Sequence, residues 1–110
     1  MARGDKAALP GGTATLVLAL LKEGEMYGYQ IIEELEKRSN QVFQLQEGTL
    51  YPILHSLEKA KLVTAREQET PAGRRRRYYR LTAAGLQALE EKKEEWQTFS
   101  RAVTAILAGA

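Results

Sequence analysis

Apolar and polar positions along this chain follow two periods, and the change between them divides the chain into helices and strands. The clearest helical period lies between residues 47 and 62, where apolar side chains recur at Leu50, Ile53, Leu54 and Leu57. Residues three and four apart share one side of a helix, so we predict an amphipathic helix with this stripe in the core. Thr49 is its expected N-cap, because a cap there places Pro52 in the first turn, where a missing N–H is tolerated.

The opposite side of this predicted helix carries no carboxylate. Its residues are Gly48, Tyr51, Pro52, His55 and Lys59. A phenol, an imidazole, an ammonium group and a flat apolar ring suit a surface that contacts an anionic partner. Backbone N–H groups left free at the N-terminus would also favour a phosphate. We therefore predict a DNA-recognition helix.

Two shorter helices are predicted before it, after an N-terminal arm over residues 1–8. The first is capped by Thr13 and ends near Gly24. Its residues 16–21 are apolar almost all round, which indicates burial on more than one side and hints at a partner chain. The second covers residues 27–38. Gly28 in its first turn indicates the close approach of another part of the chain or of a phosphate.

Strand-like alternation follows the recognition helix. Residues 62–69 and 75–81 alternate between apolar or aromatic and polar side chains, and the Thr-Pro-Ala-Gly turn at 70–73 joins them. Two such runs around a short turn predict a β-hairpin. Three helices followed by a hairpin form a winged helix-turn-helix, so the expected fold is mainly α with one β-hairpin.

A long C-terminal helix is predicted from a cap at Thr82 to about residue 107, a length of roughly 40 Å. Its apolar residues include positions seven apart, as in a coiled coil, and a small domain could not cover them all. We predict a homodimer formed by this helix and the first helix. The expected interface residues are Leu16, Leu20, Leu89, Trp96, Phe99, Val103 and Ile106.

Trp96 has two interpretations. It is either a hydrophobic anchor of the dimer or, with Phe99, part of a binding site in which two symmetry-related indole rings sandwich a flat aromatic cation.

Composition excludes several functional classes. The 110 residues are 44% apolar and 27% charged, which is typical of one soluble globular domain. The chain has no cysteine and one histidine, and we find no glycine-rich phosphate loop, so we expect neither an enzyme nor a cofactor or metal site. The longest apolar run is too short to span a membrane, and a cytoplasmic location is expected.

The net charge is only +2, but its distribution is uneven. Arginine occupies four consecutive positions from 74 to 77, and no acid lies between Glu69 and Glu90. Such a run either guards a strand edge or binds phosphate, and we favour phosphate because like charges repel one another without it. The predicted DNA contacts are Tyr27, Gly28, Thr49, Tyr51, Pro52, His55, Lys59, Arg74, Arg75, Arg76 and Arg77.

Three of these residues have alternatives that stay open. Tyr51 either donates to a backbone phosphate or packs against the protein. His55 either reaches a groove or is simply exposed. Lys59 also suits the C-terminal end of a helix, where a cation is favoured.

Two motifs closely resemble the PadR family of bacterial transcription regulators: EGTLYPILHSLE at residues 47–58 and GRRRRYYRLTAAG at residues 73–85. YGYQI at residues 27–31 fits the same pattern. The resemblance implies a dimeric winged-helix repressor that binds a near-palindromic operator and releases it when a small effector binds. With one C-terminal helix, the chain resembles the short branch, in which some members are multidrug sensors with an aromatic-lined pore between subunits, where Trp96 would lie.

We accordingly expect a DNA-binding domain over residues 1–81 and a dimerisation helix over residues 82–110. The alternatives to a DNA-binding repressor are a ligand sensor with an aromatic dimer pocket and a winged-helix protein-interaction module.

Overall fold

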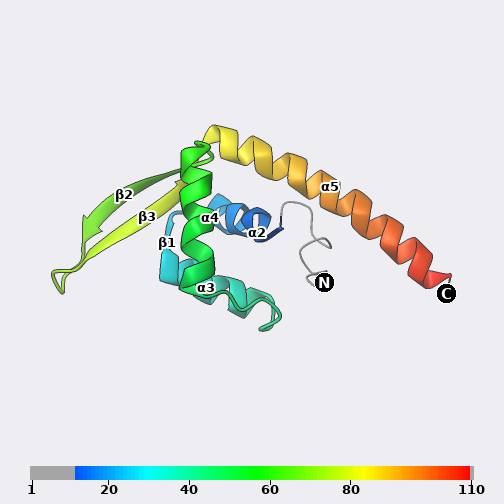
Figure 1. The fold of residues 1–110 in the computed structure, drawn as a ribbon, viewed down its shortest axis with the longest axis horizontal. Helices are drawn as coiled ribbons and strands as arrows, with labels where there is room; N and C mark the ends of the chain where they lie inside the picture. Colours follow the sequence, from blue (N-terminus) through cyan, green and yellow to red (C-terminus); the bar gives the residue numbers. More distant parts are fainter. Residues whose placement is uncertain (1–11, 110) are drawn as a thin grey trace.

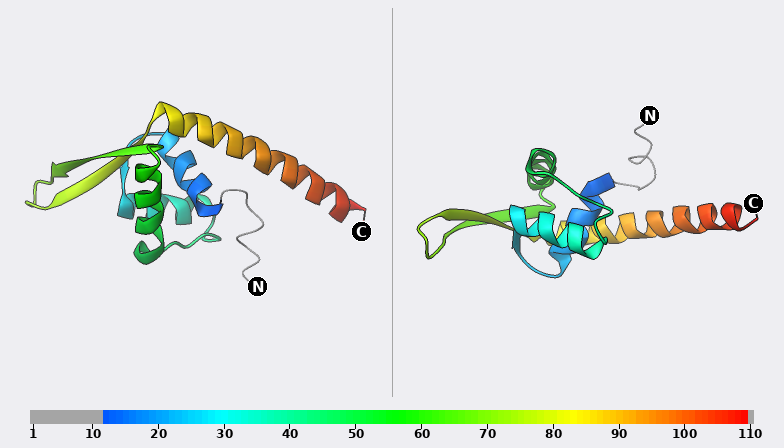
Figure 2. Two further views of the ribbon diagram at one scale, coloured as in Figure 1. Left: turned by 45° about the horizontal axis from the view of Figure 1, so that its top comes forward. Right: turned by 90° about the horizontal axis from the view of Figure 1, so that it is seen from below.

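The computed structural model describes residues 12–109, so the predicted N-terminal arm lies outside the described residues. Its elements in chain order are α2 (Gly12–Lys22), β1 (Met26–Tyr27), α3 (Gly28–Arg38), α4 (Glu47–Lys59), β2 (Val63–Glu69), β3 (Arg75–Leu81) and α5 (Ala83–Ala108). The β2–β3 hairpin and the far end of α5 extend in opposite directions from a core of three helices (Figures 1 and 2). The predicted fold, mainly α with a winged helix and a long C-terminal helix, is confirmed.

The core lies where α2, α3 and α4 meet the base of the hairpin. The most deeply buried large side chains come from five different elements: Ile31, Leu50, Leu54, Leu89, Val17 and Val63. The stripe predicted on α4 is correct, because Leu50, Leu54 and Leu57 are buried and Ile53 packs against them. The predicted burial of α2 on more than one side is also confirmed, since Val17, Leu18, Leu20 and Leu21 are all buried. This helix begins at Gly12, one residue before the predicted cap at Thr13.

The sheet has three antiparallel strands in the order β1-β3-β2. The predicted hairpin is confirmed, with Val63 opposite Leu81 at its base and Glu69 opposite Arg75 near its tip. Strand β1 was not predicted, because Tyr27 was assigned to a helix. Its backbone is extended, at φ −92° and ψ 166°, and pairs with Tyr78, so α3 starts only at Gly28.

The N-cap of helix α4 lies earlier than predicted. Gln46 is the N-cap and its carbonyl accepts from the N–H of Thr49 and of Leu50, at 3.0 and 2.9 Å, so the prediction that Thr49 caps the helix is wrong. Pro52 consequently lies in the second turn, where its missing N–H deprives the Gly48 carbonyl of a helical partner. Gly48 is exposed, so water can reach that carbonyl.

The predicted C-terminal helix and its cap are confirmed. The Thr82 side chain accepts a hydrogen bond from the N–H of Gly85 at 3.0 Å, and α5 runs 26 residues from there. A Cβ at Gly85 would overlap the carbonyl oxygen of Leu62, so only glycine allows α5 to pass this close to the start of β2. Leu89, one turn further on, is 1% exposed and anchors α5 to the core.

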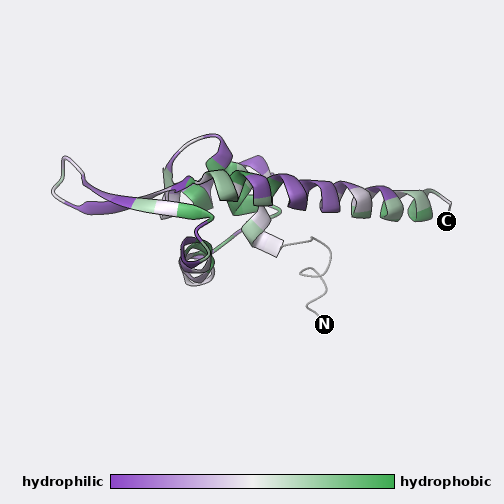
Figure 3. Cartoon of the chain, turned by 90° about the horizontal axis from the view of Figure 1, so that it is seen from above, coloured by the Kyte–Doolittle hydropathy of each residue, from purple (hydrophilic) through white to green (hydrophobic). Residues whose placement is uncertain are grey.

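Two of the predicted interface residues are therefore not available to a second chain. Leu20 and Leu89 are only 5% and 1% exposed within a single chain, because α2 and the first turns of α5 pack against each other. Leu16 is partly buried against the same core. Beyond Leu89 the apolar side of α5 is uncovered, and the green patches along its far half mark it in Figure 3. None of the described helices has the length and apolar character needed to cross a bilayer.

Candidate nucleic-acid interface

The side of α4 that faces away from the core is open to solvent. Tyr51, Pro52, His55 and Lys59 are all exposed, as are Gly48 and Thr49. The prediction that this surface lacks a carboxylate needs correction. Because α4 begins at Glu47, that residue lies one turn before Tyr51 and lines the same groove.

Tyr51 packs across to the N-terminus of α3. A Cβ at Gly28 would overlap the Tyr51 hydroxyl and lie 2.7 Å from its Cζ atom, so the missing side chain of Gly28 makes room for this phenol. Gly28 is itself buried but still lines the groove that holds the arginines, so its contact with DNA stays a prediction. Burial raises the pKa of Tyr51, and the charge of Glu47 adds to the effect. The hydroxyl therefore stays protonated near neutral pH and remains able to donate.

A groove of about 610 Å³ separates α4 from the hairpin. One wall consists of the four arginines from Arg74 to Arg77, and the other of the first turns of α3 and α4. β1 pairs with only two residues of β3, Tyr78 and Tyr79, so the arginines extend beyond it on that side. Residues in both walls were among the predicted DNA contacts, and the structure brings the two groups together across one groove.

The strand period divides the arginines between the two faces of the hairpin. Arg75 and Arg77 lie on the face of the buried Tyr79, towards α4, where two carboxylates meet them. Glu58 of α4 accepts from Arg77 at 2.7 Å, and Glu67 of β2 accepts from Arg75 at 2.8 and 3.0 Å. The hydrogen bond to Glu58 is the main reason that the pKa of Arg77 is raised. No acid lies between Glu69 and Glu90 in the sequence, but the fold brings Glu58 and Glu67 against the arginine run.

The outer face of the hairpin holds the remaining side chains. The guanidinium of Arg76 lies 4.3 Å from the centre of the Tyr27 ring, and this ring meets Tyr78 edge-on at 5.5 Å. Arg66 covers the other tyrosine at 5.0 Å and forms a bidentate ion pair with Glu25 at 2.7 and 2.8 Å. Tyr27 thus supports Arg76. Arg66 was not among the predicted site residues.

Comparison with known proteins identifies the family. The model of the PadR-like transcriptional regulator family matches residues 17–91. Transcriptional regulator Rv3488 of Mycobacterium tuberculosis is 37% identical over 81 residues, which make up 74% of this chain and 72% of that protein. The chain belongs to the PadR-like family. This family consists of transcriptional regulators, so the prediction of a regulator rather than an enzyme is confirmed.

Solved PadR-like structures have the same fold. A PadR-like transcriptional regulator from Bacillus cereus superimposes with a TM-score of 0.79 at 32% identity, covering 91% of this chain and 95% of that one. A transcriptional regulator from Clostridium thermocellum gives the same TM-score and identity over 86% of this chain and 92% of that one. The matched PadR region runs from α2 to the first turns of α5, and so includes α4, the hairpin and the groove between them.

The remaining predicted site residues of this PadR-like chain lie in two other places. His55 and Lys59 line a shallow groove of about 440 Å³ with Glu58 and Arg77, on the same side of α4 as the hairpin. Trp96 and Phe99 lie beyond the matched region, with ring centres 5.9 Å apart, and each residue is 38% exposed. The two predicted ligand-binding aromatics are thus neighbours on one open side of α5.

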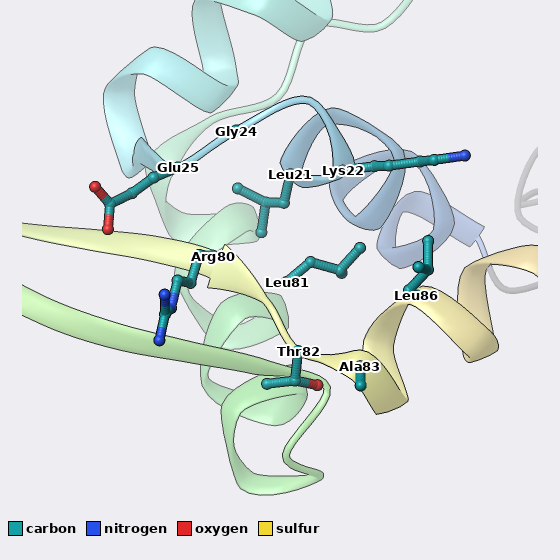
Figure 4. A pocket seen from close by; sticks show the side chains of 9 residues that line it. All are labelled: Leu21, Lys22, Gly24, Glu25, Arg80, Leu81, Thr82, Ala83 and Leu86. Carbon is teal, nitrogen blue, oxygen red and sulfur yellow. The ribbon is translucent and has the colours of Figure 1, made fainter.

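A further groove of about 640 Å³ lies where α5 leaves the domain. In Figure 4 the apolar side chains of Leu21, Leu81 and Leu86 lie between Lys22 at one end and the pair Glu25 and Arg80 at the other. None of these residues was among the predicted sites. Within residues 12–109, no cluster of three or more His, Asp or Glu side chains could hold a metal ion.

Proposed function

We propose that this PadR-like regulator is a homodimeric repressor that binds a near-palindromic DNA operator and releases it when a small molecule binds. The groove between α4 and the hairpin is the observation that carries this proposal. The exposed side of α4 would enter the major groove, and arginines of the hairpin beside it would reach the flanking phosphates. Residues 1–81 would form the DNA-binding domain.

Base contacts are assigned to the exposed residues of α4. Thr49, Pro52 and His55 lie on its open side and would face base edges. Tyr51 lies at the rim of the arginine groove, so its protonated hydroxyl would donate to a phosphate. Lys59, near the C-terminal end of α4, would contact the backbone. These assignments predict that substitutions at Thr49 or His55 change the preference between sequences.

Dimerisation is assigned to α5, within residues 82–110. Trp96, Phe99 and Val103 are each 38% exposed, and Ile106 is 74% exposed, all on the side of α5 that its own domain leaves uncovered. Burying apolar area against a second α5 would stabilise the pair by about 25 cal/mol per Å². Two-fold symmetry then places the two α4 helices on half-sites about one helical turn of DNA apart. The regulator would act in the cytoplasm.

DNA binding is tested by fluorescence anisotropy with a random duplex over a range of salt concentrations. Arg76→Gln is expected to weaken binding to all duplexes alike and to reduce the salt slope by about 1, because one phosphate contact is lost. Arg101→Gln is the matched control, since it removes the same charge from an exposed position on α5. Wild-type protein that shows no salt-dependent binding would instead favour a protein-interaction module.

Dimerisation is tested by sedimentation equilibrium. Val103→Asp is expected to shift the protein towards monomer, because it places a charge in the proposed interface. Gln97→Asp adds the same charge on the opposite side of α5 and should leave the dimer intact. A wild-type protein that sediments as a monomer at micromolar concentration would refute this part of the proposal.

A ligand-sensing role is the second candidate, favoured by the exposed pair of Trp96 and Phe99. Trp96 is the one tryptophan of the chain, so its fluorescence reports on this site alone. Planar aromatic cations that bind between two such rings should quench it and should weaken DNA binding in parallel. Quenching that leaves DNA binding unchanged would separate the two functions.

A further inference from the structure

We propose that Glu58 and Glu67 limit the affinity of the hairpin for DNA by neutralising Arg77 and Arg75, so that Arg74 and Arg76 make the hairpin's phosphate contacts. The inference rests on the proposed DNA binding and assigns different roles to four arginines that look equivalent in the sequence. It also identifies two acidic residues that control affinity without touching a base.

The neutralised cluster is built from three elements. Glu67 lies directly across the hairpin from Arg77 and diagonally from Arg75, and it contacts both guanidinium groups, at 3.6 Å and 2.8 Å. Glu58 reaches Arg77 from α4 at 2.7 Å. Two guanidinium groups and two carboxylates carry no net charge together, so this side of the hairpin attracts a phosphate only weakly.

Arg74 and Arg76 lie outside this cluster. Among residues 12–109, neither has a carboxylate within 4.0 Å. Arg76 is held by the Tyr27 ring at 4.3 Å, which orients its guanidinium without neutralising the charge. Both side chains are exposed and line the groove, where Arg76 lies against Tyr27. They are the members of the run whose full charge is free for a phosphate.

The carboxylates weaken phosphate binding even when an arginine leaves them. Side-chain exposures of 32% for Glu58 and 45% for Glu67 show that both ion pairs are solvated, and such pairs hold their partners weakly. A phosphate can therefore draw Arg77 away from Glu58, but the Glu58 carboxylate then stays within about 6 Å of the bound phosphate. Repulsion at that distance in water reduces affinity about threefold.

The experiment measures the binding of the full chain to a random duplex, as a function of salt, for Glu58→Gln and Glu67→Gln. Each substitution keeps the shape of the side chain and removes its charge. We expect binding about three- to tenfold tighter for each variant and a salt slope steeper by up to about 1, because one more arginine is available to phosphate.

Glu69→Gln is the matched control. Glu69 lies on the same strand, two residues beyond Glu67 and opposite Arg75, and its side chain has no hydrogen bond or ion pair within the described residues. The same charge is removed there without breaking an ion pair, so the comparison with Glu67→Gln isolates the effect of releasing an arginine. Equal tightening by Glu69→Gln and Glu67→Gln would overturn the inference.

A double-mutant cycle tests whether Glu58 acts through Arg77. In an Arg77→Gln background, Glu58→Gln should tighten binding no more than Glu69→Gln does. If it keeps its full effect there, or if Glu58→Gln weakens binding in the normal background, the inference is wrong and Glu58 instead positions the hairpin. Circular dichroism melting confirms that each variant is folded.

The outcomes also separate this inference from the proposed function. If wild-type protein fails to bind duplex at low salt, the proposed function is refuted and this inference with it. If wild-type protein binds with a normal salt slope, and Glu58→Gln and Glu67→Gln leave affinity and slope unchanged, only the inference is overturned.

Discussion

Gly85→Ala is expected to destabilise the protein, although alanine is the better helix former. The added Cβ would overlap the carbonyl oxygen of Leu62 and would lie 3.0 Å from its carbonyl carbon and 2.8 Å from Cδ1 of Leu81. Two of these atoms belong to the backbone at the start of β2, which cannot rotate away. The first turn of α5 would have to move by roughly 1 Å to restore ordinary contacts.

The magnitude follows from three contributions. Overpacking of this kind costs about 1–3 kcal/mol. The same movement strains the hydrogen bonds that Leu62 accepts from the N–H and the hydroxyl of Thr82, at 3.1 and 3.0 Å, each worth about 1 kcal/mol. The helix propensity of alanine offsets about 1 kcal/mol. The net loss is about 2–4 kcal/mol, which corresponds to a fall in Tm of roughly 10 °C or more.

Gly48→Ala provides the matched control, because a Cβ at Gly48 meets no atom within 4 Å. It should raise the free energy of unfolding by up to about 1 kcal/mol. Urea unfolding followed by circular dichroism, at equal protein concentrations, measures both variants. A Gly85→Ala protein as stable as wild type, beside a stabilised Gly48→Ala protein, would show that α5 does not pass this close to β2.

Three further substitutions test other local features by the same urea unfolding. Pro52→Ala should stabilise by about 1–2 kcal/mol, because it restores an N–H in the second turn of α4; a loss of stability would contradict this. Thr82→Ala should cost about 1–2 kcal/mol through loss of the N-cap, and Thr82→Ser should cost much less. The hydrogen bond from Arg66 lowers the pKa of Glu25 from 4.5, so this carboxylate stabilises the fold above about pH 4.5 and loses that effect as the pH falls through the lowered pKa. Glu25→Gln should therefore be less stable than wild type at pH 7, and the difference should shrink as the pH falls below 4.5; a difference that stays constant over that range would refute the assignment.

The periodic parts of the chain could be predicted because each is long enough to show its own period. The α4 stripe, the hairpin and the cap at Thr82 are local patterns, and the structure confirms them. β1 could not be predicted, because two residues are too few to alternate and the residues it pairs with, Tyr78 and Tyr79, lie some fifty positions away. The N-cap of α4 was missed for another reason: Gln46 caps the helix without a side-chain hydrogen bond, so no capping residue marks the position.

The sequence predicted which arginines belong to the site but not which carboxylates pair with them. The sequence places arginine at four successive positions, yet only the register of the hairpin brings Glu67 opposite Arg77, and only the packing of α4 brings Glu58 to it. The heptad pattern of α5 failed in a similar way. Leu89 and Trp96 lie seven positions apart and belong to the same heptad position, but the winged-helix domain covers Leu89 and leaves Trp96 exposed.

The close contact at Gly85 links the two proposed activities of the chain. The Thr82 hydroxyl donates to the carbonyls of Lys61 and Leu62, in the turn that directly follows α4. The hairpin separates the two helices in the sequence, but in space these hydrogen bonds fix the start of the proposed dimerisation helix directly to the end of the proposed recognition helix. In the proposed dimer, a change in the angle between two α5 helices would alter the separation of the two α4 helices. Because half-sites one helical turn apart fix that separation, a ligand at Trp96 could release DNA without touching the groove.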